Sequence, residues 1–395
     1  MSRVSRTVLV VVAALGASIV QPIAAPPPIA QAPAAPAPVA APFGRWPEAR
    51  ASQWYSAQPW LVGANYTPAN AINQLEMWQA DTFDPARIDR ELGWAEGIGM
   101  NTMRVFLHDL VWQQDAAAYQ QRIDQFLSIA DKHHIKPMLV LFDSVWDPHP
   151  KLGTQREPKP GVHNSGWVQG PGAEALQDTA QHARLETYVK GVVGAFANDR
   201  RVLAWDVWNE PDNTNGSSYK AQEPAGKEKL VLVLLPKVFA WARAAKPSQP
   251  LTSGVWRGDW STDEKMSETD RVQIANSDVI SFHNYDAAPE LEKRIGWLKR
   301  FKRPLLCTEY MARGNGSTFA GSLPVLERHG IAAYNWGLVQ GKTQTHLPWD
   351  SWQKPYTDRE PQVWFHEVFR SDGTPYRPEE IDVIKRLTGA RRKAA

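Results

Sequence analysis

Short apolar runs alternate with longer amphipathic stretches along most of this chain. Each run is bounded by polar or turn-forming residues, a pattern typical of a buried strand. We predict eight strands: Leu61–Tyr66, Thr102–Leu107, Pro137–Phe142, Leu203–Trp208, Leu251–Val255, Val279–His283, Leu305–Thr308 and Ala332–Trp336.

Amphipathic patterns between these runs predict helices at Pro85–Gly97, Tyr119–His134, Ala180–Ala197, Lys227–Ala245, Pro289–Phe301 and Gly321–His329. A last helix is predicted in two pieces, Pro361–Phe369 and Pro378–Leu387, and a short polar one near Asp263–Asp270 follows the fifth strand. Strands that alternate with helices form parallel βαβ units. Eight such units predict an α/β fold, a single (β/α)8 barrel.

Two connections are too long to be simple loops, Ser144–Thr179 after the third strand and Leu338–Glu360 after the eighth. Both follow a strand, so both lie on the C-terminal face of the barrel, where long loops usually build a substrate site.

The N-terminal region has a different composition. Arg3 and Arg6 precede an apolar run from Val8 to Val20, which predicts that residues 1–25 are a signal peptide or an uncleaved N-terminal anchor. Residues 26–42 are almost entirely proline and alanine and predict an extended linker. Residues 43–395 then form one domain outside the cytoplasm, periplasmic or extracellular, with no membrane contact beyond that possible anchor.

Charge and composition exclude several function classes. The 395 residues carry 44 basic and 42 acidic side chains, a balance that argues against nucleic-acid binding. The single cysteine, Cys307, excludes an internal disulfide framework and cysteine-based zinc sites. With no P-loop, dinucleotide fingerprint or metal-ligand spacing, we expect no cofactor, no metal and a monomer. The 18 tryptophans favour stacking on sugars, so the expected partner is a carbohydrate.

Two glutamates close predicted strands. Glu210 follows the fourth strand in Trp208-Asn209-Glu210-Pro211, and Glu309 closes the seventh in Thr308-Glu309-Tyr310. Glycosidic cleavage needs two facing carboxyl groups, one to protonate the leaving oxygen and one to attack or to activate water. The alternative for each glutamate is a structural ion pair with an arginine.

This ordered pair resembles the retaining glycoside hydrolases of the 4/7 superfamily, clan A, and is most similar to glycoside hydrolase family 5, the cellulase and mannanase family. The resemblance implies hydrolysis of a β-linked glycan by double displacement. Glu210 would be the general acid/base, Glu309 the nucleophile, and Asn209 a partner of the sugar 2-hydroxyl.

Further positions match the same family. Arg104 on the second strand would keep the nucleophile ionised. His283 and Tyr285 match a His-x-Tyr pair whose tyrosine donates to Glu309, and Trp336 matches the platform of the reacting sugar. The family histidine of the third strand is missing, because that strand closes with Asp143; the possible substitutes are His108, His149 and His163.

The loops add weaker candidates. In the loop after the third strand, Trp146 or Trp167 is expected to be a sugar platform, and Trp256 after the fifth strand is expected to contact a further sugar. Lys342 and Gln344 are expected to bind sugar hydroxyls. Two alternatives to hydrolysis remain: a carbohydrate-binding barrel with weak or no turnover, and a transglycosylase that uses the same residues.

Overall fold

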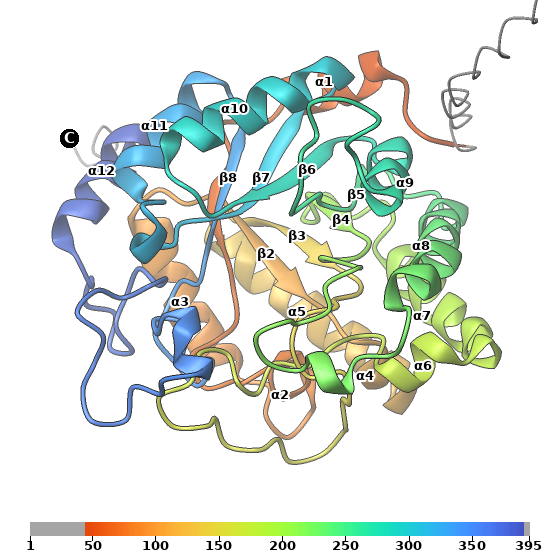
Figure 1. Ribbon diagram of the computed structural model, residues 1–395, viewed down its shortest axis with the longest axis horizontal. Helices are drawn as coiled ribbons and strands as arrows, with labels where there is room; N and C mark the ends of the chain where they lie inside the picture. The colour runs from red at the N-terminus through yellow and green to blue at the C-terminus, as the bar shows by residue number, and fades with distance from the viewer. Residues whose placement is uncertain (1–43, 391–395) are drawn as a thin grey trace, which may run out of the picture. The chain divides into compact units, whose positions relative to one another are not determined.

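The computed structural model describes residues 44–390, shown in colour in Figure 1. The predicted leader at 1–25 and linker at 26–42 lie outside the described residues. Eight parallel strands form one sheet in the order β5-β4-β3-β2-β1-β8-β7-β6. Their bounds are β1 Val62–Asn65, β2 Thr102–Phe106, β3 Lys136–Val140, β4 Ala204–Asp206, β5 Leu251–Thr252, β6 Ile280–Asn284, β7 Leu305–Tyr310 and β8 Ala332–Trp336.

The two edges of this sheet meet, because a parallel bridge joins Val255, after β5, to Phe282 in β6. The strands therefore form a nearly closed barrel, with helices around it (Figure 1). The predicted (β/α)8 fold is confirmed.

The helices surround the barrel as expected for βαβ units. They are α1 Glu48–Ser56, α2 Gln74–Trp78, α3 Pro85–Gly97, α4 Asp109–Gln114, α5 Ala116–Lys132, α6 Ala173–Gln177, α7 His182–Ala195, α8 Lys227–Ala244, α9 Glu268–Asn276, α10 Ala288–Leu298, α11 Phe319–Arg328 and α12 Pro378–Thr388. Short 3-10 turns follow α10 and occupy Trp349–Trp352 in the last loop.

Local sequence explains where helices begin. The Asp84 side chain accepts a hydrogen bond from the Arg87 backbone, and Pro85 starts α3. In α8, Val231, Leu234, Leu235 and Val238 are all buried, the spacing of a helix face that packs on a sheet.

The prediction of a helix at Pro361–Phe369 is wrong. This segment is irregular, and the Arg313 guanidinium donates to the carbonyl oxygens of Trp364, His366 and Glu367. A buried cation thus binds carbonyls that would otherwise accept helical hydrogen bonds. Arg313 itself is held by a salt bridge to Glu380 of α12, with 2.6 Å between Nη2 and Oε2.

The helix after β5 begins later than the predicted Asp263–Asp270. A reciprocal capping box fixes its start, since the Ser267 side chain accepts from the Asp270 backbone and the Asp270 side chain accepts from the Ser267 backbone. α9 therefore lies at Glu268–Asn276.

The apolar core fills the barrel and the layer between strands and helices. Near the N-terminal ends of the strands a smaller cluster forms around Trp46, Leu61, Met138 and Tyr334. In the stretch from residue 44 to residue 390, no helix has both the length and the apolar character needed to cross a membrane. Both long connections follow strands, so their residues come together at the mouth of the barrel.

Candidate active site

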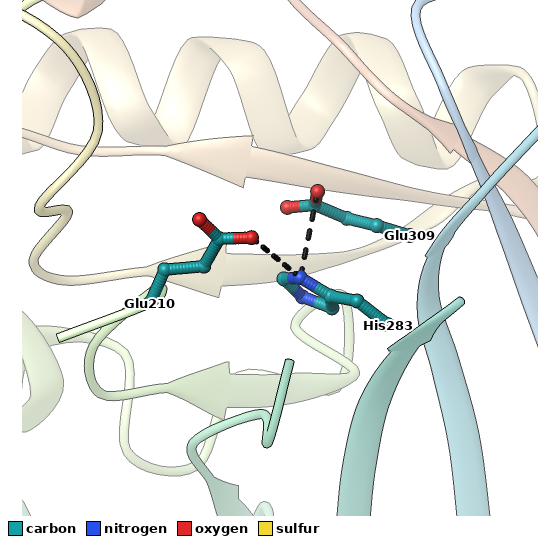
Figure 2. Close-up of side chains that lie close together, drawn as sticks. All are labelled: Glu210, His283 and Glu309. Atoms are coloured by element: carbon teal, nitrogen blue, oxygen red, sulfur yellow. Dashed lines mark hydrogen bonds and ion pairs between the residues drawn. The ribbon is translucent and has the colours of Figure 1, made fainter. Parts of the chain in front are cut away.

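Glu210 and Glu309 converge at the barrel mouth. Glu309 lies in β7, His283 lies in the neighbouring β6, and Glu210 lies four residues beyond the end of β4. Figure 2 shows both carboxyl groups turned toward the imidazole of His283. His283 Nδ1 lies 2.9 Å from Glu210 Oε1 and 3.5 Å from Glu309 Oε2. One oxygen of each glutamate and this nitrogen all lie within 4.8 Å of one another.

Arg104 anchors the nucleophile side of this group. Its guanidinium is fully buried and donates to Glu309 Oε1 at 2.8 Å and to Asp206 Oδ2 at 2.8 Å. It also donates to the side-chain oxygens of Asn65 and Asn209, at 2.9 and 2.7 Å. The Tyr285 hydroxyl donates to the other Glu309 oxygen at 2.7 Å. Glu309 therefore has a cation on one oxygen and a hydroxyl donor on the other.

Glu210 has different surroundings. Its Oε2 accepts a 2.7 Å hydrogen bond from the Asn213 amide, and its backbone is left-handed, with φ 42°. Such a backbone costs of order 1–3 kcal/mol for a residue with a side chain, and strain of this kind clusters at functional sites. Burial raises the pKa of Glu210 to about 7, against the hydrogen bond from Asn213.

Burial also raises the pKa of Glu309, while Arg104 and Tyr285 oppose that rise. His283 is neutral near pH 7, because burial lowers its pKa to about 4. Arg104 is thus the cation that faces the pair, and it contacts Glu309 directly. When the pair of glutamates carries one negative charge, that charge is therefore best stabilised on Glu309, and Glu210 holds the proton.

The two carboxyl groups open into a pocket of about 460 Å³. Its walls include Trp146, Trp256 and Trp336, all predicted sugar contacts, together with Asn209 and Tyr285. The Trp256 indole is fixed by a 2.8 Å hydrogen bond to Asp212 Oδ1. Flat aromatic faces beside paired carboxyl groups suit a pyranose ring.

Other predicted residues lie behind the pocket or away from it. Asp143 is buried and accepts from the Asn209 amide at 2.9 Å and the Trp167 indole at 2.6 Å, so it supports Asn209. Burial raises the pKa of Asp143 to about 7. Among the candidate histidines, His163 lines the pocket. His108 bonds the Gln169 carbonyl, and His149 bonds Glu174.

The expectation that Lys342 and Gln344 bind sugar hydroxyls is wrong. Lys342 Nζ donates to Glu76 Oε1 at 2.6 Å. Gln344 donates to the Lys159 and Val162 carbonyls and accepts from the Gly161 backbone. Both side chains are engaged in holding loops together.

Several pocket residues were missed from the sequence. Asn213, Asn215, Trp349 and His366 all line it and come from loops. Asp206, behind the pocket, had a usable signal: a carboxylate inside an otherwise apolar strand requires a buried cation, which Arg104 supplies.

Among residues 44–390, one group of side chains is close enough together to hold a metal ion, and it consists of Glu210, His283 and Glu309. Arg104 and Tyr285 already contact the two oxygens of Glu309. These two donors suit a carboxylate that reacts with a substrate better than one that binds a metal ion.

Comparison with known proteins gives a partial family match. Residues 162–275 match the model of glycosyl hydrolase family 10, which belongs to clan A. This range contains Asn209 and Glu210 but ends before Glu309. It differs from family 5, which the sequence pattern resembles.

Curated relatives match over shorter stretches. The mannan endo-1,4-β-mannosidase A of Emericella nidulans is 29% identical over 91 residues, 23% of this chain and 21% of that protein. The probable mannan endo-1,4-β-mannosidase A of Aspergillus niger is 26% identical over 153 residues, 34% of this chain and 38% of that protein. The chain thus spans less than two fifths of the length of these relatives.

A solved structure extends the likeness over most of the barrel. The exo-β-1,4-mannosidase from Opitutaceae bacterium strain TAV5 superposes with a TM-score of 0.56 at 17% identity, covering 85% of this chain and 60% of that one. At this identity the likeness concerns the fold. Together the matches relate the chain to the clan A glycoside hydrolases.

Proposed function

We propose that this chain is a retaining β-glycosidase, closest to family 5, that hydrolyses β-1,4-linked mannosides. The observation that carries the proposal is the pair of buried carboxyl groups, Glu210 and Glu309, with facing oxygens within 4.8 Å and different partners. Retaining enzymes hold their carboxyl groups about 5–5.5 Å apart, whereas inverting enzymes hold them about 6.5–9.5 Å apart to admit a water. Two oxygens within 4.8 Å are compatible with double displacement, which we propose because Glu309 has both a cation and a hydroxyl donor to stabilise the carboxylate that attacks.

In the first step, a Glu309 oxygen attacks the anomeric carbon while the bond to the leaving oxygen breaks. Glu210 gives its proton to that oxygen. In the second step, Glu210 takes a proton from water, whose oxygen attacks the anomeric carbon and releases Glu309 as a carboxylate. Two inversions leave the product with the configuration of the substrate.

Neighbouring side chains fit this sequence. Asn209 lines the pocket while its amide donates to Asp143, so a second amide hydrogen is available for the sugar 2-hydroxyl. Arg104 and Tyr285 stabilise the carboxylate form of Glu309 before attack and on its release.

The choice of mannose comes from the relatives, whose names give β-1,4-mannosidase activity for both endo- and exo-acting proteins. Export from the cytoplasm remains part of the proposal, on the leader predicted at residues 1–25.

A substrate screen with product analysis tests this function. Aryl β-mannoside, β-glucoside and β-xyloside are incubated with the protein, and the first anomer released is followed by NMR. Release of β-mannose supports the proposal, whereas first release of the α-anomer would indicate inversion. Sugar transfer to an acceptor in place of water would indicate the transglycosylase, and binding without turnover the carbohydrate-binding barrel.

The first prediction concerns pH. Because Glu210 must be protonated to act as an acid, and burial raises its pKa to about 7, kcat/KM on a mannoside with an alkyl leaving group should fall above about pH 7. Initial rates from pH 4 to 9 measure this limb. An aryl mannoside with an acidic leaving group serves as the control, and its kcat/KM should decline less, because this leaving group needs little protonation. If kcat/KM already declines above about pH 4, Glu210 does not act as the general acid.

The second prediction concerns Tyr285. Replacing it by phenylalanine removes the hydroxyl that donates to Glu309. A hydrogen bond to a charged group contributes about 1.5–3 kcal/mol, so kcat/KM should fall about 10- to 150-fold. The pKa of Glu309 should rise, which moves the acidic limb of the pH profile to higher pH.

Tyr310→Phe is the matched control. Tyr310 follows Glu309 on β7 and is buried, and its hydroxyl has no hydrogen-bond partner in the described part of the chain. Its pH profile should match that of the wild type. An acidic limb that stays in place in Tyr285→Phe would show that Tyr285 does not support the charge of Glu309.

A further inference from the structure

The two long loops are joined to each other across one side of the barrel mouth. Residues 159–164 after β3 contact residues 343–356 after β8, and we call these two segments the loop wall. Asn164 donates from its backbone to the Thr343 carbonyl at 2.8 Å, and His163 donates from its backbone to Ser351 Oγ at 2.9 Å. The Tyr356 backbone donates to the Gly161 carbonyl at 2.9 Å. The wall is thus a bonded structure and not two independent loops.

The order of strands places Trp336, at the end of β8, opposite the acid/base. In the closed sheet, β8 lies four strands from β4 in either direction, so the two are diametrically opposed. Glu210 follows β4, and Trp336 ends β8. A leaving group protonated by Glu210 lies on the β4 side, so the rest of the sugar extends toward Trp336.

A recess of about 20 Å³ lies next to Trp336 and is lined in part by Asn65, Phe106, Asn164, Trp336 and Glu367. A cavity needs about 10–15 Å³ of free space to hold one water molecule. The recess therefore admits one hydroxyl or hydroxymethyl group and has no room for a second sugar ring.

Asn164 and Trp336 line both this recess and the catalytic pocket. The Asn164 side chain is fully buried, and neither its amide nitrogen nor its amide oxygen has a hydrogen-bond partner in residues 44–390. A buried amide group without a hydrogen-bond partner is unfavourable, because it has lost its hydrogen bonds to water and gained none in return. The Asn164 backbone is left-handed, with φ 47°. A buried, strained and unpaired amide at this point is explained by a ligand that supplies the missing partners.

Glu367 also lines the recess. It is buried, Thr345 donates to its Oε1, and its Oε2 has no partner within the described residues. Gly337 makes this position possible, since a Cβ there would lie 2.7 Å from the Glu367 carboxyl group. Burial raises the pKa of Glu367 to about 8, so it is protonated at neutral pH and can donate a hydrogen bond.

Building on the proposed function, we propose that the site is exo-acting: it binds the non-reducing terminal sugar alone, with the Asn164 amide hydrogen-bonding a hydroxyl at the closed end. The loop wall blocks any sugar attached beyond that unit. Single sugars are then removed one at a time from a chain end, and the remaining chain leaves past the loops after β4 and β5, where Asn213 and Trp256 line the pocket.

Cleavage of β-1,4-mannohexaose with a fluorescent label at its reducing end tests the closed end. We expect unlabelled mannose and labelled mannopentaose as the first products. Labelled di- or trisaccharide at early times would show internal cleavage and overturn the inference while leaving the proposed function intact. If neither the hexaose nor any aryl β-glycoside is hydrolysed, the proposed function itself fails.

Asn164→Gly tests the recognition residue, because glycine keeps the left-handed backbone and removes only the amide side chain. Loss of hydrogen bonds in the bound complex should lower kcat/KM on aryl β-mannoside about 10-fold or more, with the melting temperature close to that of the wild type. Asn164→Asp keeps the side-chain size while it replaces the amide donor by an acceptor, and should show a similar loss.

Lys302→Gly is the matched control: Lys302 is exposed, has φ 54° and lies after α10, away from the pocket. It should hydrolyse aryl β-mannoside like the wild type. Wild-type kcat/KM in folded Asn164→Gly and Asn164→Asp would overturn the role of Asn164.

Discussion

Replacing Glu309 by alanine is expected to lower kcat on a β-mannoside by at least about 10⁴-fold, because the residue that forms the covalent bond to the sugar is lost. No glycosyl-enzyme should be detected by mass spectrometry, even with a 2-fluoro aryl mannoside that slows release of the intermediate. The Arg104 guanidinium then faces an empty space where Glu309 Oε1 accepted its hydrogen bond, while Asp206 still holds it in place.

Two variants separate chemistry from folding. Glu309→Gln keeps the shape of the side chain but cannot attack as an anion, and should be as inactive as the alanine variant. Cys307→Ala changes another buried residue of β7 and should remain active. A Glu309→Ala protein that stays folded and keeps a tenth of the wild-type rate would remove Glu309 from the nucleophile role.

The barrel was predictable because its signal is local and repeated. Every predicted strand overlaps an observed one, from Val62–Asn65 to Ala332–Trp336. Buried parallel strands give continuous apolar runs, and cap residues such as Asp84 mark helix starts. The helix expected at 361–369 failed because Arg313, some 50 residues earlier, binds its carbonyl groups. No local pattern carries that information.

The residues of the candidate site also fall into two groups, those that local sequence predicts and those that depend on distant contacts. Glu309, His283 and Glu210 follow from strand ends, which meet at one face of any such barrel. Asn213 and Trp349 were missed because loops bring them to the pocket. Lys342 and Gln344 do lie in the long loop after β8, but the Lys342 side chain bonds Glu76 of α2 and the Gln344 side chain bonds Lys159 in the loop wall. The composition of a loop indicates polar chemistry without showing whether a side chain faces substrate or another loop.

Glu210→Ala should behave differently from Glu309→Ala. On a mannoside with a poor leaving group the rate should fall about 10²–10⁴-fold, the usual contribution of a general acid. With an activated aryl mannoside, whose leaving group needs little protonation, the glycosyl-enzyme should still form on Glu309 and then accumulate, because no base activates water. A burst of aryl alcohol followed by slow turnover is the expected kinetic signature.

Azide then assigns the two roles from the product. In Glu210→Ala, azide enters the vacated space near Asn213, attacks the glycosyl-enzyme and gives a β-mannosyl azide, with turnover restored. In Glu309→Ala, azide takes the place of the nucleophile itself and any azide product has the α configuration. The wild type, whose own carboxylates do both steps, should gain nothing from azide. The anomer reports which face of the sugar each glutamate serves, so an α-azide from Glu210→Ala and a β-azide from Glu309→Ala would exchange the two roles. The expected assignment follows from the contacts of the pair: Arg104 and Tyr285 both bind Glu309, the group that must carry the charge, and burial beside the neutral amide of Asn213 keeps the proton on Glu210.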